Sequence, residues 1–222
     1  VTDVAVGAFK DDEAEKDAGA VHILSLDADG KMTTAARTIG NNDLATDPIN
    51  KQDYFGYSVA NAGDIDGNGV NDLVVGSIRD ELSTGTKDIG SARILFLDNS
   101  LNVINHTTIT TNSAGFNTSL AKMKYFGSAV AGNFDINADG IPDIAVGARW
   151  HKEAGKNKSG AVYVLIMNAD GTVAAEQKIA RGVGGMATTV PDKNDEFGSS
   201  VTSPGDINGD GVPDLVVGAI GD

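Results

Sequence analysis

The chain has 222 residues, no cysteine and a formal net charge of −14 at pH 7. The lack of cysteine excludes disulfides, thiolate metal sites and cysteine nucleophiles, and the acidic charge argues against nucleic acid or an anionic membrane surface as a partner. No apolar stretch approaches the roughly 20 residues that span a membrane, so we expect no membrane insertion.

Short apolar runs bounded by turn residues recur along the chain, and such runs are typical of buried β-strands. The first kind of run lies at Asp3–Gly7, Asp72–Gly76, Asp143–Gly147 and Asp214–Gly218. The second kind follows a glycine, at Gly19–Leu26, Gly90–Leu97 and Gly160–Met167. A third, more polar strand is expected near Met32–Ile39, Val103–Thr110 and Val173–Ile179. Turn residues at Asp27–Gly30 and Asn168–Gly171 predict hairpins that join the second kind of strand to the third.

An aromatic-glycine pair recurs every 71 residues, at Phe55-Gly56, Phe126-Gly127 and Phe197-Gly198. Each pair is followed by a short stretch with an alternating residue pattern, which predicts one more strand. These stretches are Tyr57–Ala60, Ser128–Ala131 and Ser199–Thr202. Four antiparallel strands per repeat, stacked radially, describe a β-propeller blade, so the predicted fold is an all-β propeller. We expect a blade without its first strand at 1–54, complete blades at 55–125 and 126–196, and the first half of another at 197–222.

A nine-residue loop joins the first and second strands of a repeat in three places, again 71 residues apart. Oxygen-bearing side chains stand at loop positions 1, 3, 5 and 9, a glycine stands at position 6, and position 7 can offer its backbone carbonyl. This arrangement suits Ca²⁺, a hard cation that takes roughly 6–8 oxygen ligands. Three calcium sites are therefore predicted, with the ligands Asp64, Asp66, Asn68, Val70 and Asp72; Asp135, Asn137, Asp139, Ile141 and Asp143; and Asp206, Asn208, Asp210, Val212 and Asp214.

An EF-hand and a metal-free turn are the alternatives to this kind of calcium loop. An EF-hand needs a glutamate at position 12 and flanking helices, whereas position 12 is Val75, Val146 and Val217, each inside a predicted strand. The loops could also be turns without metal, since Asp, Asn and Gly favour turns anyway. An ordinary turn does not need carboxylates at both positions 1 and 9, three times over, so calcium is the favoured interpretation.

Taken together, these motifs resemble the FG-GAP repeats of the integrin α-subunit propeller and its bacterial relatives. The resemblance covers nearly the whole chain. One departure is visible, because the proline of the family's Gly-Ala-Pro is replaced by Phe9, Ile78, Arg149 and Ile220. The resemblance implies a calcium-stabilised binding or adhesion module, outside the cell or on its surface, for a protein or glycan ligand. A non-catalytic propeller attached to a secreted hydrolase or lyase, or a structural subunit of an extracellular assembly, is the alternative.

The calcium prediction also bears on location. Three bound Ca²⁺ ions would reduce the net charge from −14 to −8. Extracellular modules commonly bind calcium at about 10⁻⁴–10⁻³ M, a concentration found outside cells and not in the cytosol. The loops therefore favour an extracellular or cell-surface protein.

The predicted blades at the two ends of the chain are incomplete. Either a longer parent protein supplies the missing strands, or chains complete each other's blades and form a homo-oligomer.

The sequence contains no recognisable catalytic motif, and the chain is expected not to be an enzyme. The loops that vary most between repeats are Lys10–Ala18, Arg79–Ile89 and Arg149–Ser159, and variable loops on a rigid scaffold are where ligands usually bind. One of them begins with Arg149-Trp150-His151, which holds the single tryptophan of the chain. We expect this tryptophan to pack over the edge of its blade, and a sugar or protein contact is the alternative.

Overall fold

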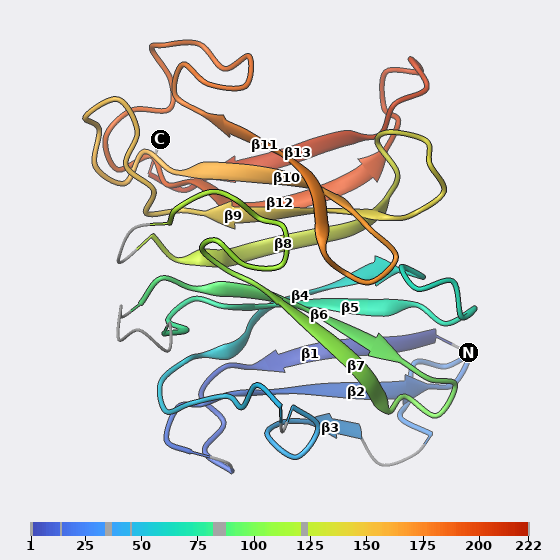
Figure 1. The fold of residues 1–222 in the computed structure, drawn as a ribbon. Helices are drawn as coiled ribbons and strands as arrows, with labels where there is room; N and C mark the ends of the chain where they lie inside the picture. The colour runs from blue at the N-terminus through green and yellow to red at the C-terminus, as the bar shows by residue number, and fades with distance from the viewer. Residues whose placement is uncertain are drawn as a thin grey trace.

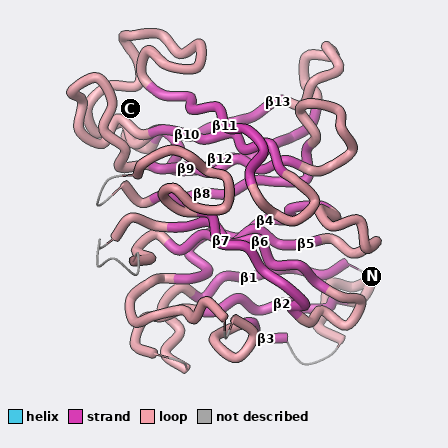
Figure 2. Tube along the Cα trace, in the orientation of Figure 1, coloured by secondary structure: helices cyan, strands magenta, loops and turns pink. Residues whose placement is uncertain are grey.

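The computed structural model describes residues 2–13, 15–33, 37–44, 46–81, 88–120 and 124–221. Every regular element in these ranges is a β-strand (Figure 2), and the ranges hold no helix that could cross a membrane. The strands are β1 (Thr2–Ala8), β2 (Ala20–Leu26), β3 (Arg37–Ile39), β4 (Phe55–Gly63), β5 (Asp72–Ser77), β6 (Ser91–Leu97), β7 (Val103–Ile109), β8 (Phe126–Phe134), β9 (Asp143–Ala148), β10 (Ala161–Met167), β11 (Val173–Ala180), β12 (Phe197–Gly205) and β13 (Asp214–Ala219).

The strands form four antiparallel sheets. In Figure 1 the sheets that hold β1–β3, β4–β7 and β8–β11 follow one another in chain order from bottom to top, and β12 and β13 overlap the third of them in this view. Two sheets have four strands, in the orders β4-β5-β6-β7 and β8-β9-β10-β11, and the others are β1-β2-β3 and β12-β13. The first strands of successive sheets contact each other, β4 against β8 and β8 against β12. The predicted β-propeller architecture, with a loop between the first and second strand of each repeat, is confirmed.

The outer strand of the first sheet is shorter than the sequence suggests. The expected strand was Met32–Ile39, whereas β3 covers Arg37–Ile39 and Met32 forms an isolated bridge to Leu26. Residues 34–36 of the expected strand lie outside the described ranges, as do residues 82–87 of the loop at Arg79–Ile89. The other two outer strands, β7 and β11, begin at the predicted residues.

Close backbone packing between neighbouring sheets explains the recurring glycines. A Cβ atom at Gly76 on β5 would lie 2.1 Å from the carbonyl oxygen of Gly127 on β8. The same contact recurs one repeat later, where a Cβ at Gly147 would lie 2.1 Å from the carbonyl oxygen of Gly198. No side chain fits at such distances, so the glycine of the second strand and the Phe-Gly glycine of the next repeat are a matched pair.

The core lies in the seams between sheets. Phe55 and Phe126, the aromatic residues of the Phe-Gly pairs, are both fully buried, and each belongs to the apolar cluster of its own seam. Phe126 stacks on Phe116 with ring centroids 5.2 Å apart and meets Tyr163 edge-on at 5.6 Å. Aromatic pairs of this kind add to the stabilisation that burial gives, so the Phe-Gly pair joins one blade to the next.

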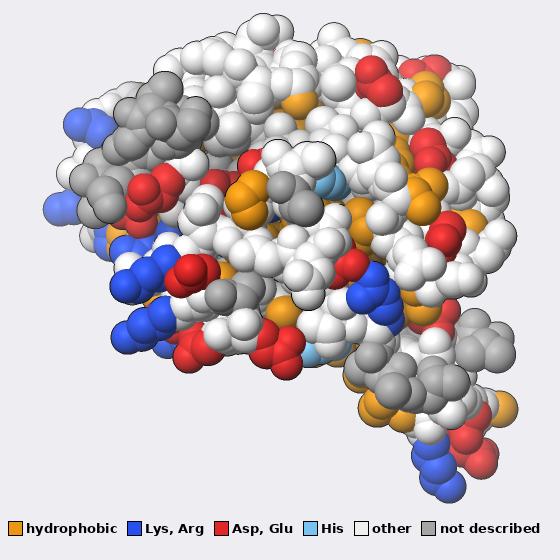
Figure 3. All heavy atoms as spheres, turned by 60° about the horizontal axis from the view of Figure 1, so that its bottom comes forward, with side chains coloured by type: hydrophobic (Ala, Val, Ile, Leu, Met, Phe, Trp, Pro, Cys, Tyr) orange, Lys and Arg blue, Asp and Glu red, His pale blue; other side chains and the backbone are white. Residues whose placement is uncertain are grey.

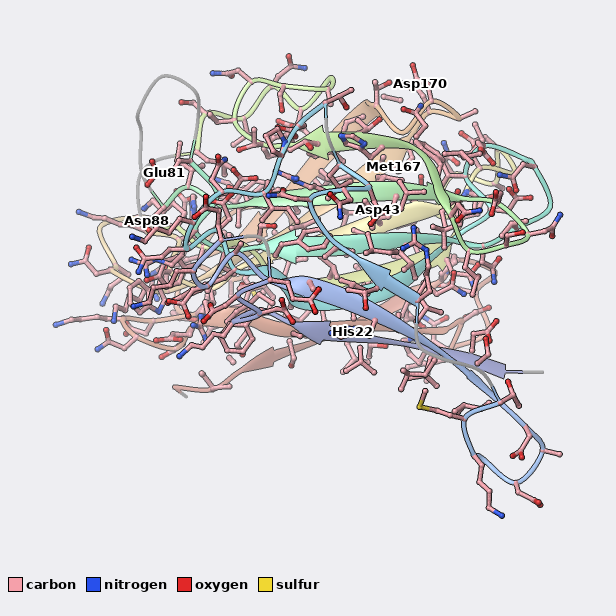
Figure 4. All side chains as sticks on the ribbon, turned by 90° about the horizontal axis from the view of Figure 1, so that it is seen from below. His22, Asp43, Glu81, Asp88, Met167 and Asp170 are labelled. Carbon is pink, nitrogen blue, oxygen red and sulfur yellow. The ribbon has the colours of Figure 1, made fainter. Side chains whose placement is uncertain are left out.

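The sheets have two ends, which carry different sets of loops. The three nine-residue loops lie at the right in Figure 1, and we call this the metal-loop end. The described parts of the connections that join the second and third strands, residues 9–13 and 15–19, 78–81 and 88–90, and 149–160, lie at the left, which we call the long-loop end. Glu81 and Asp88 mark the long-loop end in Figure 4. On the opposite side of the same view, the turn at residues 27–33, which follows β2, projects from the body.

Candidate metal centre

The three nine-residue loops have the same internal hydrogen bonds, in which the backbone N–H group at position 6 donates to the aspartate at position 1. The distances are 2.9 Å for Gly69 to Asp64, 2.8 Å for Gly140 to Asp135 and 2.8 Å for Gly211 to Asp206. The N–H group at position 7 likewise donates to the side chain at position 5, at 2.7–2.9 Å. These bonds fold the loop tightly around its side-chain oxygens.

The position-9 aspartate holds each loop to its sheet. Asp72 and Asp143 are fully buried, although carboxylates are rarely buried without partners. One oxygen of Asp72 accepts the N–H of Ile65 in the loop at 3.0 Å, and the other accepts the N–H of Leu97 on β6 at 3.1 Å. Asp143 repeats this arrangement with Ile136 and with Met167, which is labelled in Figure 4. Each of these two loops is thus tied to the third strand of its own blade.

The first loop gathers its carboxylates most closely. Asp64, Asp66 and Asp72 each have an oxygen within 4.8 Å of the others, the one acidic group of this kind in the described ranges. The Oδ1 atom of Asp64 is buried and has no hydrogen-bond partner. Burial raises the pKa of Asp72 to about 6, and the charges of Asp66 and Asp64 add to the rise. A cation that takes oxygen ligands would satisfy the unpartnered oxygen and offset the repulsion, so these residues fit Ca²⁺.

The second and third loops differ because their acids stand at positions 1, 5 and 9, with an asparagine at position 3. Asn137 donates to Asp139 at 2.8 Å, and Asn208 donates to Asp210 at 3.0 Å. Positions 3 and 5 therefore lie side by side in both loops, but the three aspartates do not come within the distance found in the first loop. The backbone carbonyls at position 7, those of Val70, Ile141 and Val212, remain predicted ligands.

Trp150 packs at the long-loop end, away from the metal loops. Its ring stacks on Tyr125 at a centroid distance of 4.2 Å, and its Nε1–H group donates to Glu196 at 3.2 Å. The ammonium of Lys158 lies 3.9 Å from the same ring. Sequence reasoning expected the tryptophan at the blade edge but missed Tyr125. The available signal was a tyrosine before the Phe-Gly pair in two successive repeats, at Tyr54 and Tyr125.

A buried polar cluster between the first two sheets was also missed. Arg93 is 1% exposed, and its guanidinium contacts Asp80 at 3.2 Å and Asp47 at 3.6 Å. Asp53, also 1% exposed, lies near enough for the charge of Asp80 to raise its pKa. No motif spacing marks these residues, because they come from two different loops and a strand.

Comparison with known proteins finds one repeat family and several integrin α subunits that are similar to parts of this chain. The family model described as "FG-GAP repeat" matches residues 126–165 and 197–220. Integrin alpha-V of Gallus gallus is 34% identical over 174 residues, which is 76% of this chain and 15% of that protein. Integrin alpha-8 of Homo sapiens is 32% identical over 171 residues, with the same two shares. Integrin alpha pat-2 of Caenorhabditis elegans is 42% identical over 94 residues, 42% of this chain and 7% of that protein.

Proposed function

This chain carries FG-GAP repeats that form β-propeller blades and is related to the integrin α subunits, and on that premise we propose that it is a calcium-stabilised adhesion module. Its matched region spans about 15% of the length of these relatives. In the proposal, the metal loops rigidify the blades, and the long-loop end presents its loops to a protein ligand outside the cell or on its surface. No catalytic step is part of this function.

The observation that carries the proposal is the shared hydrogen-bond pattern of the three loops together with the converging carboxylates of the first. The ligands would be the side chains at positions 1, 3, 5 and 9, and the metal would supply positive charge among them. The position-9 aspartates Asp72 and Asp143 would pass this ordering to β6 and β10, because each bonds a backbone N–H of that strand. The variable loops are attached to the strands that the metal would order in this way.

Calcium titration by calorimetry tests the proposal. We expect about three Ca²⁺ ions per chain with dissociation constants of about 10⁻⁴–10⁻³ M, the usual range of extracellular modules. Asp135→Ala should remove one ion and leave the other two, because the loops lie on separate sheets. Asp170→Asn is the matched control, since Asp170 is an exposed aspartate in the β10–β11 turn of the same sheet. Titrations that release no heat, or an Asp135→Ala variant that still binds three ions, would contradict the proposal.

A further inference from the structure

The long-loop end carries a stack of cations and aromatic rings across the seam between the sheets β4–β7 and β8–β11. Arg149 follows β9, and the carbon of its guanidinium lies 5.4 Å from the ring centroid of Tyr57 on β4 and 5.7 Å from that of Tyr125. Tyr125 immediately precedes β8, so one guanidinium joins two neighbouring blades. Lys and Arg side chains gather at this end, at the left in Figure 3.

Arg149 differs from every other arginine of the chain in its charge partners. The other four have a carboxylate oxygen within 4.0 Å: Arg37 with Asp43, Arg79 with Asp88, Arg93 with Asp80 and Arg181 with Asp192. Among the described residues, no carboxylate lies within that distance of Arg149. Its Nε atom is buried without a hydrogen-bond partner, and a buried donor left unpaired is costly. In a chain of net charge −14, an unpaired guanidinium is not explained by a shortage of acids.

The surroundings of Arg149 favour an anion. Burial and the charge of Lys152 lower the pKa of Lys124, whose backbone carbonyl accepts the N–H of Trp150 at 3.3 Å. Lys158 lies over Trp150 in the same stack. A guanidinium presents its donors in a planar fork that matches a carboxylate, and a guanidinium already held on aromatic rings loses little freedom when it binds one.

The stack also discriminates between a sugar and a protein side chain. Sugars usually bind aromatic rings face to face, but Tyr125 already carries Arg149 and Trp150, and Trp150 already carries Tyr125 and Lys158. The rings therefore have little free face for a sugar, whereas the guanidinium lacks an acidic partner. We propose that Arg149 is the anchor for an aspartate or glutamate side chain of a protein partner. This deepens the proposed function and rests on it, because it names the chemistry received at the long-loop end.

Nuclear magnetic resonance of the calcium-loaded chain tests the proposal, with the capped peptide acetyl-Gly-Asp-Gly-amide as the probe. We expect saturable shifts of the Arg149 Nε–H and Trp150 Nε1–H signals. The matched peptide acetyl-Gly-Asn-Gly-amide should bind at least roughly tenfold more weakly, because it lacks the carboxylate. Glucuronate represents an acidic sugar and should also bind more weakly than the aspartate peptide.

The variant Arg149→Met should abolish the Trp150 shift and leave calcium binding unchanged, since the metal loops lie at the other end of the strands. Arg79→Met is the control: Arg79 also lies over a tyrosine ring, that of Tyr54, but is paired with Asp88, so the Trp150 shift should persist. Equal binding of both peptides, tighter binding of glucuronate, or a persistent shift in Arg149→Met would overturn the proposal. If one of these results is found while the chain still binds three Ca²⁺ ions, the proposed role of Arg149 is wrong and the proposed calcium sites are unaffected.

Discussion

At the scale of single residues, Asp53 is the most unusual acid outside the metal loops. It is 1% exposed, one of its oxygens accepts the N–H of Asn50 at 2.6 Å, and the other is buried without a partner. Burial, followed by the charge of Asp80, raises its pKa from 3.8 to about 7. The nearby guanidinium of Arg93 opposes the rise but does not cancel it. The carboxylate is therefore held in a place that suits its protonated form.

This predicts a pH dependence of stability that a single substitution removes. Below pH 4 Asp53 is protonated in both the folded and the unfolded chain, and its ionisation then takes nothing from the stability of the fold. Between about pH 4 and pH 7 only the unfolded chain loses the proton, so the contribution of Asp53 to stability falls as the pH rises, by at most about 4 kcal/mol. Above pH 7 the cost is constant. Asp53→Asn should therefore raise the melting temperature at pH 8 and change it little at pH 4.

The control for this measurement is Asp29→Asn, because Asp29 is an exposed turn residue. Melting curves at both pH values, recorded at one calcium concentration, make the comparison. If Asp53→Asn destabilises the chain equally at pH 4 and pH 8, the buried carboxylate is ionised in the folded state and the assignment of its pKa is wrong.

At the scale of elements, the seam between neighbouring blades depends on glycine pairs. Gly76→Ala would place a methyl group 2.1 Å from the carbonyl oxygen of Gly127 and 2.4 Å from the hydroxyl of Ser58. Backbone cannot retreat as a flexible side chain can, so the sheets β4–β7 and β8–β11 would have to separate. We expect a loss of stability of about 1–3 kcal/mol, the usual cost of overpacking, measured by urea unfolding.

Gly40→Ala is the matched control for the seam, because a Cβ atom at Gly40 meets nothing within 4 Å. It should change the free energy of unfolding by no more than about 0.5 kcal/mol. A Gly76→Ala variant as stable as the Gly40→Ala variant would show that the blades are not packed as closely as the structure has them.

The elements also show what sequence reasoning could and could not reach. A period of 71 residues made the strands, the Phe-Gly pair and the metal loops predictable, because each repeat must bury the same face against its neighbours. The stack of Arg149 on Tyr57 and Tyr125 was not predictable, since it joins residues of two repeats and occurs at one seam. Likewise, the link from Asp72 to the N–H of Leu97 spans 25 residues, and it follows from strand pairing and not from local spacing.

At the scale of the whole molecule, the two ends of the sheets have different chemistry. The three loops of the metal-loop end hold nine aspartates and no lysine or arginine. Carboxylates at such density repel one another at low ionic strength, and bound cations would remove that repulsion. The long-loop end instead holds Arg149 and several lysines among its acids. Calcium should thus stabilise the metal-loop end of the blades, while the long-loop end remains free to bind a protein ligand.

Thermal unfolding with and without calcium tests the calcium-stabilised propeller most directly. An ion that binds only the folded chain stabilises it by mass action, by about 1.4 kcal/mol per site at ten times the dissociation constant. We expect the melting temperature to rise between a chelator and about 10 mM CaCl₂. The Asp135→Ala variant should lose part of that rise, and the Asp170→Asn control should keep all of it. Melting curves that superimpose in chelator and in calcium would show that the loops are preformed turns and would contradict a calcium-stabilised propeller.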